Sequence, residues 1–239
     1  MKIYIIPYAF GTSYSLETLK QGLKCIFKNT IEIVCMDMPG HGKQIMEPLE
    51  YSIKKIAAIM GNRLLKTQDF NEPYYILGIS MGAIVATEIC HYLNLFEVNL
   101  PRRMLITCSF SPFKKVTYKA YEQFTLVDIR EELSTHVHVP KELLDNIDFL
   151  NFLKPIVMAD LIALRDYQYN YLNTLLGCPI SLIVGYKDYE KDKKDFKNWH
   201  LVSSDVENLK IICGEHLFFM ESEKQLNVFV KEIKKAINV

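Results

Sequence analysis

The sequence YYILGISMGAIVATEICHYL, residues 74–93, encodes a strand, a tight turn and a helix in succession. Tyr74–Ile79 is rich in β-branched and aromatic residues, which favours a buried strand, and Ala83–Leu93 carries apolar residues at helical spacing. Between them, Gly78-Ile79-Ser80-Met81-Gly82 fits G-x-S-x-G, a pattern that exposes a serine hydroxyl on a sharp strand-to-helix turn. The pattern predicts that Ser80 is a nucleophile; the alternative is a tight turn whose serine has no catalytic role.

Short apolar runs and longer helical stretches alternate on both sides of this unit, which is typical of a parallel sheet with helices on both faces. The predicted strands are Ile3–Ile6, Ile31–Met36, Tyr74–Ile79, Met104–Ser109, Ile180–Gly185 and Leu209–Cys213. The helices predicted to cover them are Leu16–Phe27, Ser52–Leu65, Ala83–Leu93 and Lys224–Ile237. The expected fold class is therefore α/β, with a doubly wound, mostly parallel sheet.

Residues 112–175 interrupt the alternation, because helical patterns follow one another there without a strand between them. These patterns are Leu126–Leu133, Lys141–Phe149 and Phe152–Leu172. We expect a single domain over residues 1–239, with a core of residues 1–111 and 176–239 and a helical lid insertion at 112–175. The alternative is a small helical domain without a gating role.

A serine nucleophile needs a histidine base, and after a strand-turn-helix elbow of this kind the chain order is serine, acid, histidine. His216 follows the last predicted strand, so it leaves the sheet at the edge where Ser80 lies. The other histidines precede the acid candidates or fall in a predicted helix: His41, His91, His136, His138 and His200. His216 is therefore the expected base, the alternative being a surface histidine in a turn.

Asp188 is the expected acid, because it directly follows the predicted strand 180–185 at the same edge of the sheet. Asp192 and Asp195 are rival acids, which lie farther along the highly charged run 187–195. That run mixes both signs of charge and reads as an exposed loop.

An oxyanion hole requires two backbone N–H groups near the nucleophile. One comes from the residue after the serine, Met81, and the other from the loop after the first strand. In that loop, Pro7-Tyr8-Ala9-Phe10-Gly11, we expect the donor to be Ala9.

Composition argues against several other classes of protein. The 28 basic and 28 acidic side chains cancel, so there is no overall field to attract a nucleic acid. The six cysteines lack metal-ligand spacing and are expected to be reduced core residues of a cytoplasmic protein. Pro7 interrupts the first apolar run before it reaches signal-peptide length, and no apolar segment has the ~18 residues of a membrane span. We expect no metal and no cofactor.

Motifs along almost the whole chain match those of one known family. Near the N-terminus, IPYAFG (6–11) is similar to F-P-Y-A-G-G, and MPGHG (38–42), followed by Glu47-Pro48, is similar to L-P-G-R-G with a downstream E-P. Further matches are SMGA (80–83) with Glu88, LKP (153–155) with Ala159-Asp160 and Asp166-Tyr167, and Asp188 with Trp199 and GEHLF (214–218). The chain thus resembles the type II thioesterases of nonribosomal peptide and polyketide biosynthesis, which are stand-alone editing enzymes of the α/β-hydrolase superfamily.

The resemblance implies a serine hydrolase that removes acyl groups from the phosphopantetheine arm of acyl or peptidyl carrier proteins in an antibiotic-type pathway. Ser80, His216 and Asp188 would then carry out acyl-enzyme catalysis, with Met81 and Ala9 as oxyanion donors. Three alternatives stay open: a carboxylesterase or lipase, an acyltransferase with the same triad, and a non-catalytic binding protein on the same fold.

Two further expectations follow from this function. Lys114 and Lys115 come after a strand at the carboxyl edge, where an acidic carrier protein would dock, whereas Arg102 and Arg103 precede that strand and should face away. Some apolar residues of the insertion should line an acyl channel, the candidates being Phe149, Leu150, Phe152, Leu153, Tyr167, Tyr169, Tyr171 and Leu172.

The chain also departs from the pattern of the family at four positions. Ile79 replaces the usual His before the nucleophile and should point into the turn, away from substrate. Phe10 stands where a Gly is usual, which bears on the width of the pocket, and Glu215 adds a carboxylate beside His216. His41 replaces an Arg, and we expect it to be a structural loop residue.

Overall fold

A six-stranded sheet forms the centre of the protein in this computed structural model, which describes residues 1–115, 120–136, 139–171 and 174–237. The strand order is β2-β1-β3-β4-β5-β6, and every neighbouring pair is parallel. The strands are β1 (Lys2–Ile6), β2 (Glu32–Cys35), β3 (Tyr74–Ile79), β4 (Arg103–Thr107), β5 (Ile180–Gly185) and β6 (Val206–Ile212). Because all strands run the same way, the loops that leave their carboxyl ends gather at one edge. The predicted α/β class and parallel sheet are confirmed.

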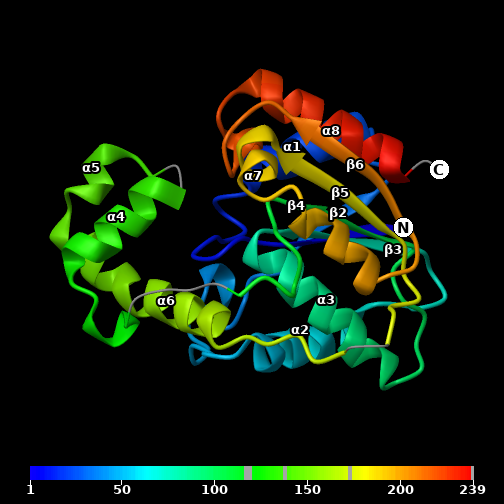
Figure 1. The fold of residues 1–239 in the computed structure, drawn as a ribbon, viewed down its shortest axis with the longest axis horizontal. Helices are drawn as coiled ribbons and strands as arrows, with labels where there is room; N and C mark the ends of the chain where they lie inside the picture. The colour runs from blue at the N-terminus through cyan, green and yellow to red at the C-terminus, as the bar shows by residue number, and fades with distance from the viewer. Residues whose placement is uncertain (116–119, 137–138, 172–173, 238–239) are drawn as a thin grey trace.

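Helices cover both faces of this sheet, as Figure 1 shows. One face carries α1 (Glu17–Ile26) and α8 (Glu223–Ile237), and the other carries α2 (Ile53–Thr67) and α3 (Met81–Asn94). Outside the insertion at 112–175, short helices are α7 (Tyr186–Lys191) and the 3₁₀ turns η1 (Gly42–Gln44), η3 (Asp195–Leu201) and η4 (Phe218–Met220), and a further 3₁₀ turn, η2 (Tyr121–Gln123), lies within the insertion. Each face of the sheet therefore has its own layer of packed side chains.

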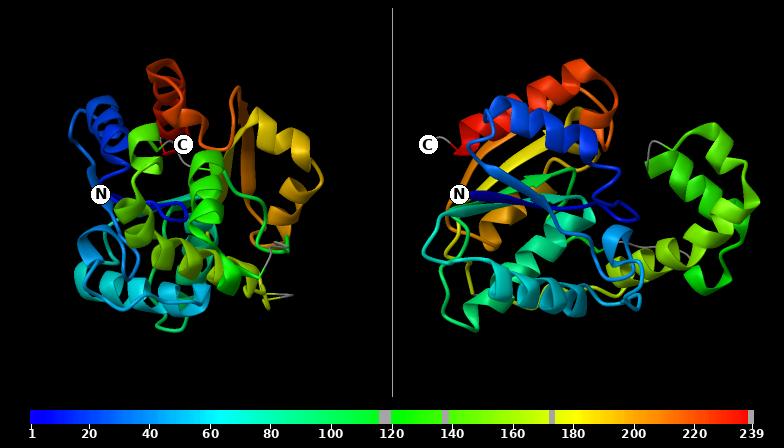
Figure 2. Two further views of the ribbon diagram at one scale, coloured as in Figure 1. Left: turned by 90° about the vertical axis from the view of Figure 1, so that its left-hand side faces the viewer. Right: turned by 180° about the vertical axis from the view of Figure 1, so that it is seen from behind.

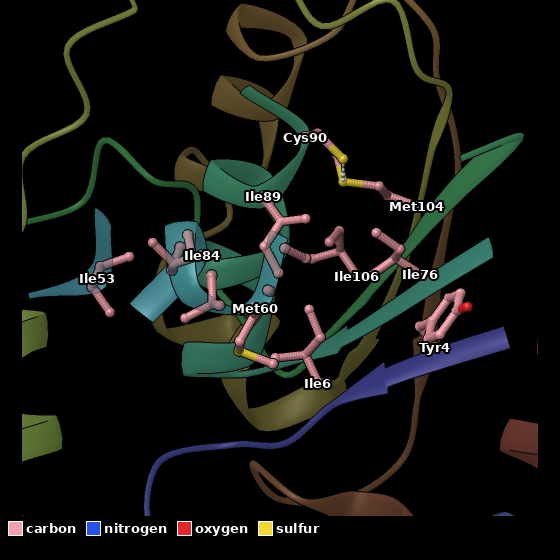
Figure 3. Close-up of a cluster of buried hydrophobic side chains, with 14 of the residues drawn as sticks. Tyr4, Ile6, Ile53, Met60, Ile76, Ile84, Ile89, Cys90, Met104 and Ile106 are labelled. Atoms are coloured by element: carbon pink, nitrogen blue, oxygen red, sulfur yellow. Dashed lines mark hydrogen bonds between the residues drawn. The ribbon is translucent and has the colours of Figure 1, made fainter. Parts of the chain in front are cut away.

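The central strand β3 is buried along its whole length, because helices lie on both of its faces. Figure 3 shows one of the two layers, in which Ile6, Ile76 and Ile106 from neighbouring strands meet side chains of α2 and α3. A strand covered on both faces must be apolar throughout, which is why the continuous apolar run in the sequence correctly predicted this strand.

The edge strand β6 begins earlier than its apolar run indicates. It starts at Val206, whereas the sequence predicted Leu209. Glu207 and Lys210 belong to the paired part of this strand, and Glu207 forms an ion pair with Arg103 on β4. An edge strand has water on one side and tolerates charged residues, so a search for uninterrupted apolar residues finds only its end.

Residues 112–175 contain three described α-helices that stand beside the sheet (Figure 2). They are α4 (Leu126–His136), α5 (Lys141–Leu144) and α6 (Ile147–Arg165). The boundaries predicted for the second and third helices of the insertion, 141–149 and 152–172, were wrong. The Asn146 side chain accepts a hydrogen bond from the Phe149 N–H at 3.0 Å and starts a new helix there, and α6 continues through Pro155. The end predicted for this helix, Leu172, lies outside the described residues.

This insertion has a small apolar cluster of its own. Its buried members are Tyr121, Phe124, Ile129, Leu133, Leu144, Leu150, Val157 and Leu161. Farther along α6, Ala163 belongs instead to the cluster between the sheet and the α2–α3 layer. The helix α6 therefore connects the insertion to the body of the protein.

The prediction that the cysteines are core residues was correct for only part of them. All six are free thiols, and Cys90, Cys108 and Cys178 are buried. Cys25 and Cys213 are exposed, because they lie at the ends of their elements, where an apolar neighbourhood in the sequence does not guarantee burial in the fold.

Candidate active site

Ser80 occupies a strained turn between β3 and α3. Its backbone angles are φ 53° and ψ −118°, a region that residues with a Cβ rarely adopt. The flanking glycines make the turn possible, because a Cβ on Gly82 would lie 2.2 Å from the Ile6 carbonyl oxygen and one on Gly78 would lie 2.5 Å from the Ala83 Cα. The strand-turn-helix geometry predicted for this segment is therefore present.

Ser80, His216 and Asp188 form a continuous hydrogen-bonded chain. The Ser80 Oγ lies 2.9 Å from His216 Nε2, and His216 Nδ1 lies 2.6 Å from the Asp188 Oδ2. Burial alone would raise the pKa of Asp188, but the hydrogen bond and charge of His216, helped by Lys191, outweigh it and hold that pKa below its ordinary value. The carboxylate therefore stays ionised and fixes the orientation of the imidazole ring.

The two rival acids, Asp192 and Asp195, bind other residues. Asp195 accepts hydrogen bonds from the Ser111 N–H at 2.6 Å and from the Ser111 hydroxyl at 2.8 Å. Asp192 forms an ion pair with Lys114 at 2.9 Å. The run 187–195 is mostly exposed, as expected, but much of it is helical in α7 and η3 rather than loop, and Asp188 and Asp195 are buried in it.

Most of the other histidines lie elsewhere in the fold. His91 is buried and contacts the Tyr169 hydroxyl at 3.0 Å, and His200 is exposed on η3. His41 is buried and contacts Asp160 on α6 at 3.1 Å. Of the remaining two, His136 is the last residue of α4 and His138 lies outside the described residues.

The two residues expected to supply oxyanion donors, Met81 and Ala9, both line the cavity at Ser80. Met81 is the first residue of α3, where the N–H groups of a helix lack intrahelical partners. In the oxyanion loop, residues 7–11, the Gly11 N–H donates to the Tyr8 carbonyl at 2.9 Å, and the Phe10 N–H donates to the Asp160 Oδ2 at 2.7 Å. These two donors are engaged elsewhere, and Ala9, the donor expected from the sequence, lines the same cavity as Ser80.

A cavity of about 620 Å³ opens over Ser80 and extends beneath the insertion. Its apolar wall includes Ile84 from α3 and Leu161, Leu164 and Tyr167 from the insertion. Of the eight channel residues expected from the sequence, only Tyr167 belongs to the described lining. Phe152 points to solvent with 57% of its surface exposed, and the expected end of the group, Leu172, lies outside the described residues.

The other members of that expected group pack away from the cavity. Phe149, Leu150 and Leu153 pack in the cluster of the insertion, and Tyr169 and Tyr171 pack against the α2–α3 layer. Sequence reasoning missed Leu161 and Leu164, because several faces of α6 are apolar and periodicity does not show which one meets the cavity.

A buried carboxylate fixes the chain that follows α6. Glu88 on α3 accepts hydrogen bonds from the Tyr167 hydroxyl at 2.8 Å and the Tyr171 hydroxyl at 2.9 Å. Burial raises the pKa of Glu88, and the two hydroxyls offset only part of that rise. This acid therefore holds Tyr167 in place at the wall of the cavity.

Three of the residues that depart from the family pattern, Ile79, Phe10 and Glu215, lie close to the triad in the sequence or in the oxyanion loop. Ile79 is buried in the core, as expected. Phe10 has φ 65°, a left-handed conformation that explains why glycine is usual at its position. Glu215 is largely exposed and pairs with Lys187 at 3.1 Å, so its charge is directed toward solvent.

The family model of the thioesterase domain matches residues 1–237. The chain belongs to the thioesterase family. This thioesterase is 27% identical to linear gramicidin dehydrogenase LgrE of Brevibacillus parabrevis, over 83% of this chain and 76% of the relative. It is 21% identical to gramicidin S biosynthesis protein GrsT of Aneurinibacillus migulanus, over 96% of this chain and 87% of that relative. The predicted enzyme class, a hydrolase of thioesters, is confirmed.

Solved structures agree with this assignment at the level of the fold. The thioesterase is similar to YbtT, described as a type II thioesterase of the yersiniabactin pathway, with a TM-score of 0.82 and 22% identity over 98% of this chain and 91% of that one. The TM-score between this thioesterase and ClbQ of the colibactin pathway is 0.83, with 19% identity over 99% of this chain and 96% of ClbQ. The α/β-hydrolase fold and the resemblance to type II thioesterases are thus confirmed.

Two kinds of feature are absent from the residues that the structure describes. None of the helices in that part of the thioesterase is both long and apolar enough to cross a membrane. In the same residues, the His, Cys, Asp and Glu side chains form no group of three or more that could hold a metal ion.

Proposed function

We propose that this thioesterase hydrolyses acyl thioesters on the phosphopantetheine arm of carrier proteins in a nonribosomal peptide or polyketide pathway. The observation that carries the proposal is the hydrogen-bonded chain from Ser80 through His216 to Asp188 at the floor of a cavity. The descriptions of several relatives support the choice of pathway, since GrsT is a gramicidin S biosynthesis protein and YbtT belongs to a mixed peptide and polyketide pathway.

In the proposed mechanism, the Ser80 Oγ attacks the thioester carbonyl while His216 Nε2 takes its proton. The carbonyl oxygen becomes negatively charged and is stabilised by the N–H groups of Met81 and Ala9. The C–S bond then breaks, and the thiol leaves with the proton carried by His216. Water, deprotonated by His216, then attacks the acyl-enzyme. The bond between the acyl carbon and the Ser80 Oγ breaks, His216 returns the proton to that Oγ, and the free acid is released.

A thiol leaving group makes the acid role of His216 undemanding. The pKa of a free thiol is about 8.5, so it departs with much less protonation than an amine needs. The proposed triad is therefore better suited to thioesters than to peptides.

We also propose that residues 112–175 act as a lid. Leu161 and Leu164 on α6 form part of the cavity wall, so movement of this helix would change access to Ser80. A closed lid of this kind would limit the access of water to the acyl-enzyme.

The proposal is tested by intact-mass spectrometry of acyl-loaded carrier proteins. The wild type should convert them to the free phosphopantetheine form, and Ser80→Ala should lower turnover by roughly 10⁵- to 10⁶-fold without loss of fold. A Ser80→Ala enzyme that keeps a tenth of the activity would contradict the assignment. Much faster hydrolysis of p-nitrophenyl esters would favour an esterase, and product that forms only with an added acceptor would favour an acyltransferase. Failure of a fluorophosphonate to label Ser80 would favour a non-catalytic protein.

Carrier-protein docking is expected at the mouth of the cavity, which includes Lys114 and Lys115. Lys114 is paired with Asp192, whereas Lys115 is exposed. Lys115→Glu should raise the KM for an acidic carrier protein several-fold and leave hydrolysis of an acyl-pantetheine fragment unchanged. Equal effects on both substrates would place Lys115 in the pocket. Arg103, directed elsewhere by its ion pair with Glu207, provides no docking surface.

A further inference from the structure

A buried histidine and a buried aspartate join three segments that are distant in the sequence. His41, next to η1, is 2% exposed, and Asp160 on α6 is fully buried. The Asp160 Oδ2 lies 3.1 Å from His41 Nε2 and also accepts the Phe10 N–H at 2.7 Å. One carboxylate oxygen thus holds both the loop of His41 and the oxyanion loop against α6.

The contacts of the His41 ring favour its positively charged form. Its Nδ1 lies 2.9 Å from the Pro39 carbonyl oxygen and its Nε2 faces Asp160. A carbonyl and an ionised carboxylate can only accept hydrogen bonds, so both contacts are satisfied when both ring nitrogens carry a hydrogen. Burial lowers the pKa of His41, but Asp160, with smaller contributions from the Pro39 carbonyl and Asp37, outweighs it and raises that pKa to about 8.

The Phe10 N–H is held in an uncommon backbone conformation. Phe10 has φ 65°, which is unfavourable for an aromatic residue and persists only where surrounding contacts enforce it. The hydrogen bond to Asp160 is such a contact, and the turn from Gly11 N–H to the Tyr8 carbonyl closes the other side. Ala9 lies inside this turn, so the direction of its N–H depends on both restraints.

We propose that His41 and Asp160 are positioning residues that aim the Ala9 N–H at the developing oxyanion by holding the oxyanion loop against α6. This inference rests on the proposed catalytic role of Ser80. The titratable groups that act on His41 are Asp160, from α6, and Asp37, from the segment before its own turn, and both are acidic. The oxyanion loop presents the backbone N–H of Phe10 to the same carboxylate.

The arrangement predicts a specific response to alkaline pH. When His41 loses its proton, one ring nitrogen presents a lone pair to an acceptor oxygen and the attraction between ring and carboxylate ends. The restraint on Phe10 then weakens, and kcat should fall as pH rises through about 8. Substrate binding in the apolar part of the cavity does not use this pair, so KM should change little.

The test measures kcat and KM for an acyl-pantetheine thioester against pH, together with Tm. His41→Arg keeps a permanent positive charge, so its alkaline fall in kcat should be absent. His41→Gln should lower kcat about tenfold or more at all pH values, a smaller loss than deletion of a donor causes. Arg63→Gln is the matched control, because Arg63 binds the Asp37 carbonyl and Glu47 on the same segment without touching Asp160. It should lower Tm and keep the wild-type pH profile.

Several outcomes would overturn the inference. Identical pH profiles for the wild type and His41→Arg would do so, as would a change in KM alone. If His41→Gln does not fold, the comparison of the wild type with His41→Arg still decides. Ser80→Ala separates the two proposals: an inactive Ser80→Ala with fully active His41→Gln refutes the positioning role alone, whereas an active Ser80→Ala refutes the proposed function.

Discussion

Replacing Asp188 with Asn should cost far more activity than the loss of one charge suggests. Lys191 Nζ lies 3.6 Å from the Asp188 Oδ1, while the Oδ2 accepts from His216 Nδ1 at 2.6 Å. In the variant, the amide oxygen should turn toward the Lys191 ammonium, which places the amide NH₂ against His216 Nδ1. The ring must then accept on Nδ1 and carry its proton on Nε2, facing Ser80, where it cannot act as a base.

The loss expected from this wrong tautomer is about 10⁴-fold in kcat, the size that the same substitution causes in serine proteases. At 1.36 kcal/mol per tenfold, it corresponds to about 5.5 kcal/mol of transition-state stabilisation. The assay is hydrolysis of an acyl-pantetheine thioester, with Tm as the measure of folding. Adding Lys191→Met to Asp188→Asn should recover part of the activity, because the amide is then free to turn its oxygen toward His216.

The rival acids serve as controls for this prediction. Asp192→Asn should leave kcat within a few-fold of wild type, because it removes only a partly exposed ion pair with Lys114, and an amide oxygen can still accept the Asp195 N–H. Asp195→Asn should lower Tm through its two hydrogen bonds to Ser111. The reasoning fails if Asp188→Asn loses less than tenfold in kcat, or if either control loses more than Asp188→Asn does.

Three further predictions concern the walls and frame of the site. Leu164→Phe should fill part of the 620 Å³ cavity and shift kcat/KM toward short acyl groups, as measured with thioesters of increasing chain length; an unchanged preference would remove Leu164 from the acyl wall. Glu88 has a folded pKa raised above its ordinary value of 4.5, so its ionised form opposes folding at neutral pH. Glu88→Gln should therefore raise Tm at pH 7 and lose that advantage as the pH falls below 4.5, and a constant Tm difference across this range would contradict it. Gly82→Ala should cost about 4 kcal/mol or more in unfolding free energy, because its Cβ would lie 2.2 Å from the Ile6 carbonyl; a Tm near wild type would show that the turn can relax.

The elbow and the positions of the parallel strands could be predicted because their causes are local. The apolar run before Gly78 and the helical spacing after Gly82 are written in consecutive residues. A parallel sheet then brings the loops after β3, β5 and β6 to one edge, so chain order alone indicated that Ser80, Asp188 and His216 are neighbours.

The features that were predicted wrongly depend on side-chain contacts that the hydrophobic periodicity of the sequence does not reveal. The start of α6 depends on the side chain of Asn146 as a helix cap, and its passage through Pro155 depends on contacts with the rest of the fold. The burial of Asp195 depends on Ser111, which lies 84 residues away. The contact between His41 and Asp160 spans 119 residues and joins a turn to the insertion, so the sequence alone indicated only a structural loop residue.

The separate apolar cluster of the insertion has a consequence for how this enzyme diverges from its relatives. In the described part of the chain, its eight buried side chains form a group apart from the two clusters that flank the sheet. Leu161 belongs to that group and also forms part of the cavity wall. Mutations that repack the group therefore reshape the room available to an acyl chain while the elbow keeps its support. Selection on substrate range can therefore leave the elbow untouched, but Phe10 of the oxyanion loop packs against the same group, so repacking near Phe10 would change specificity and catalysis together.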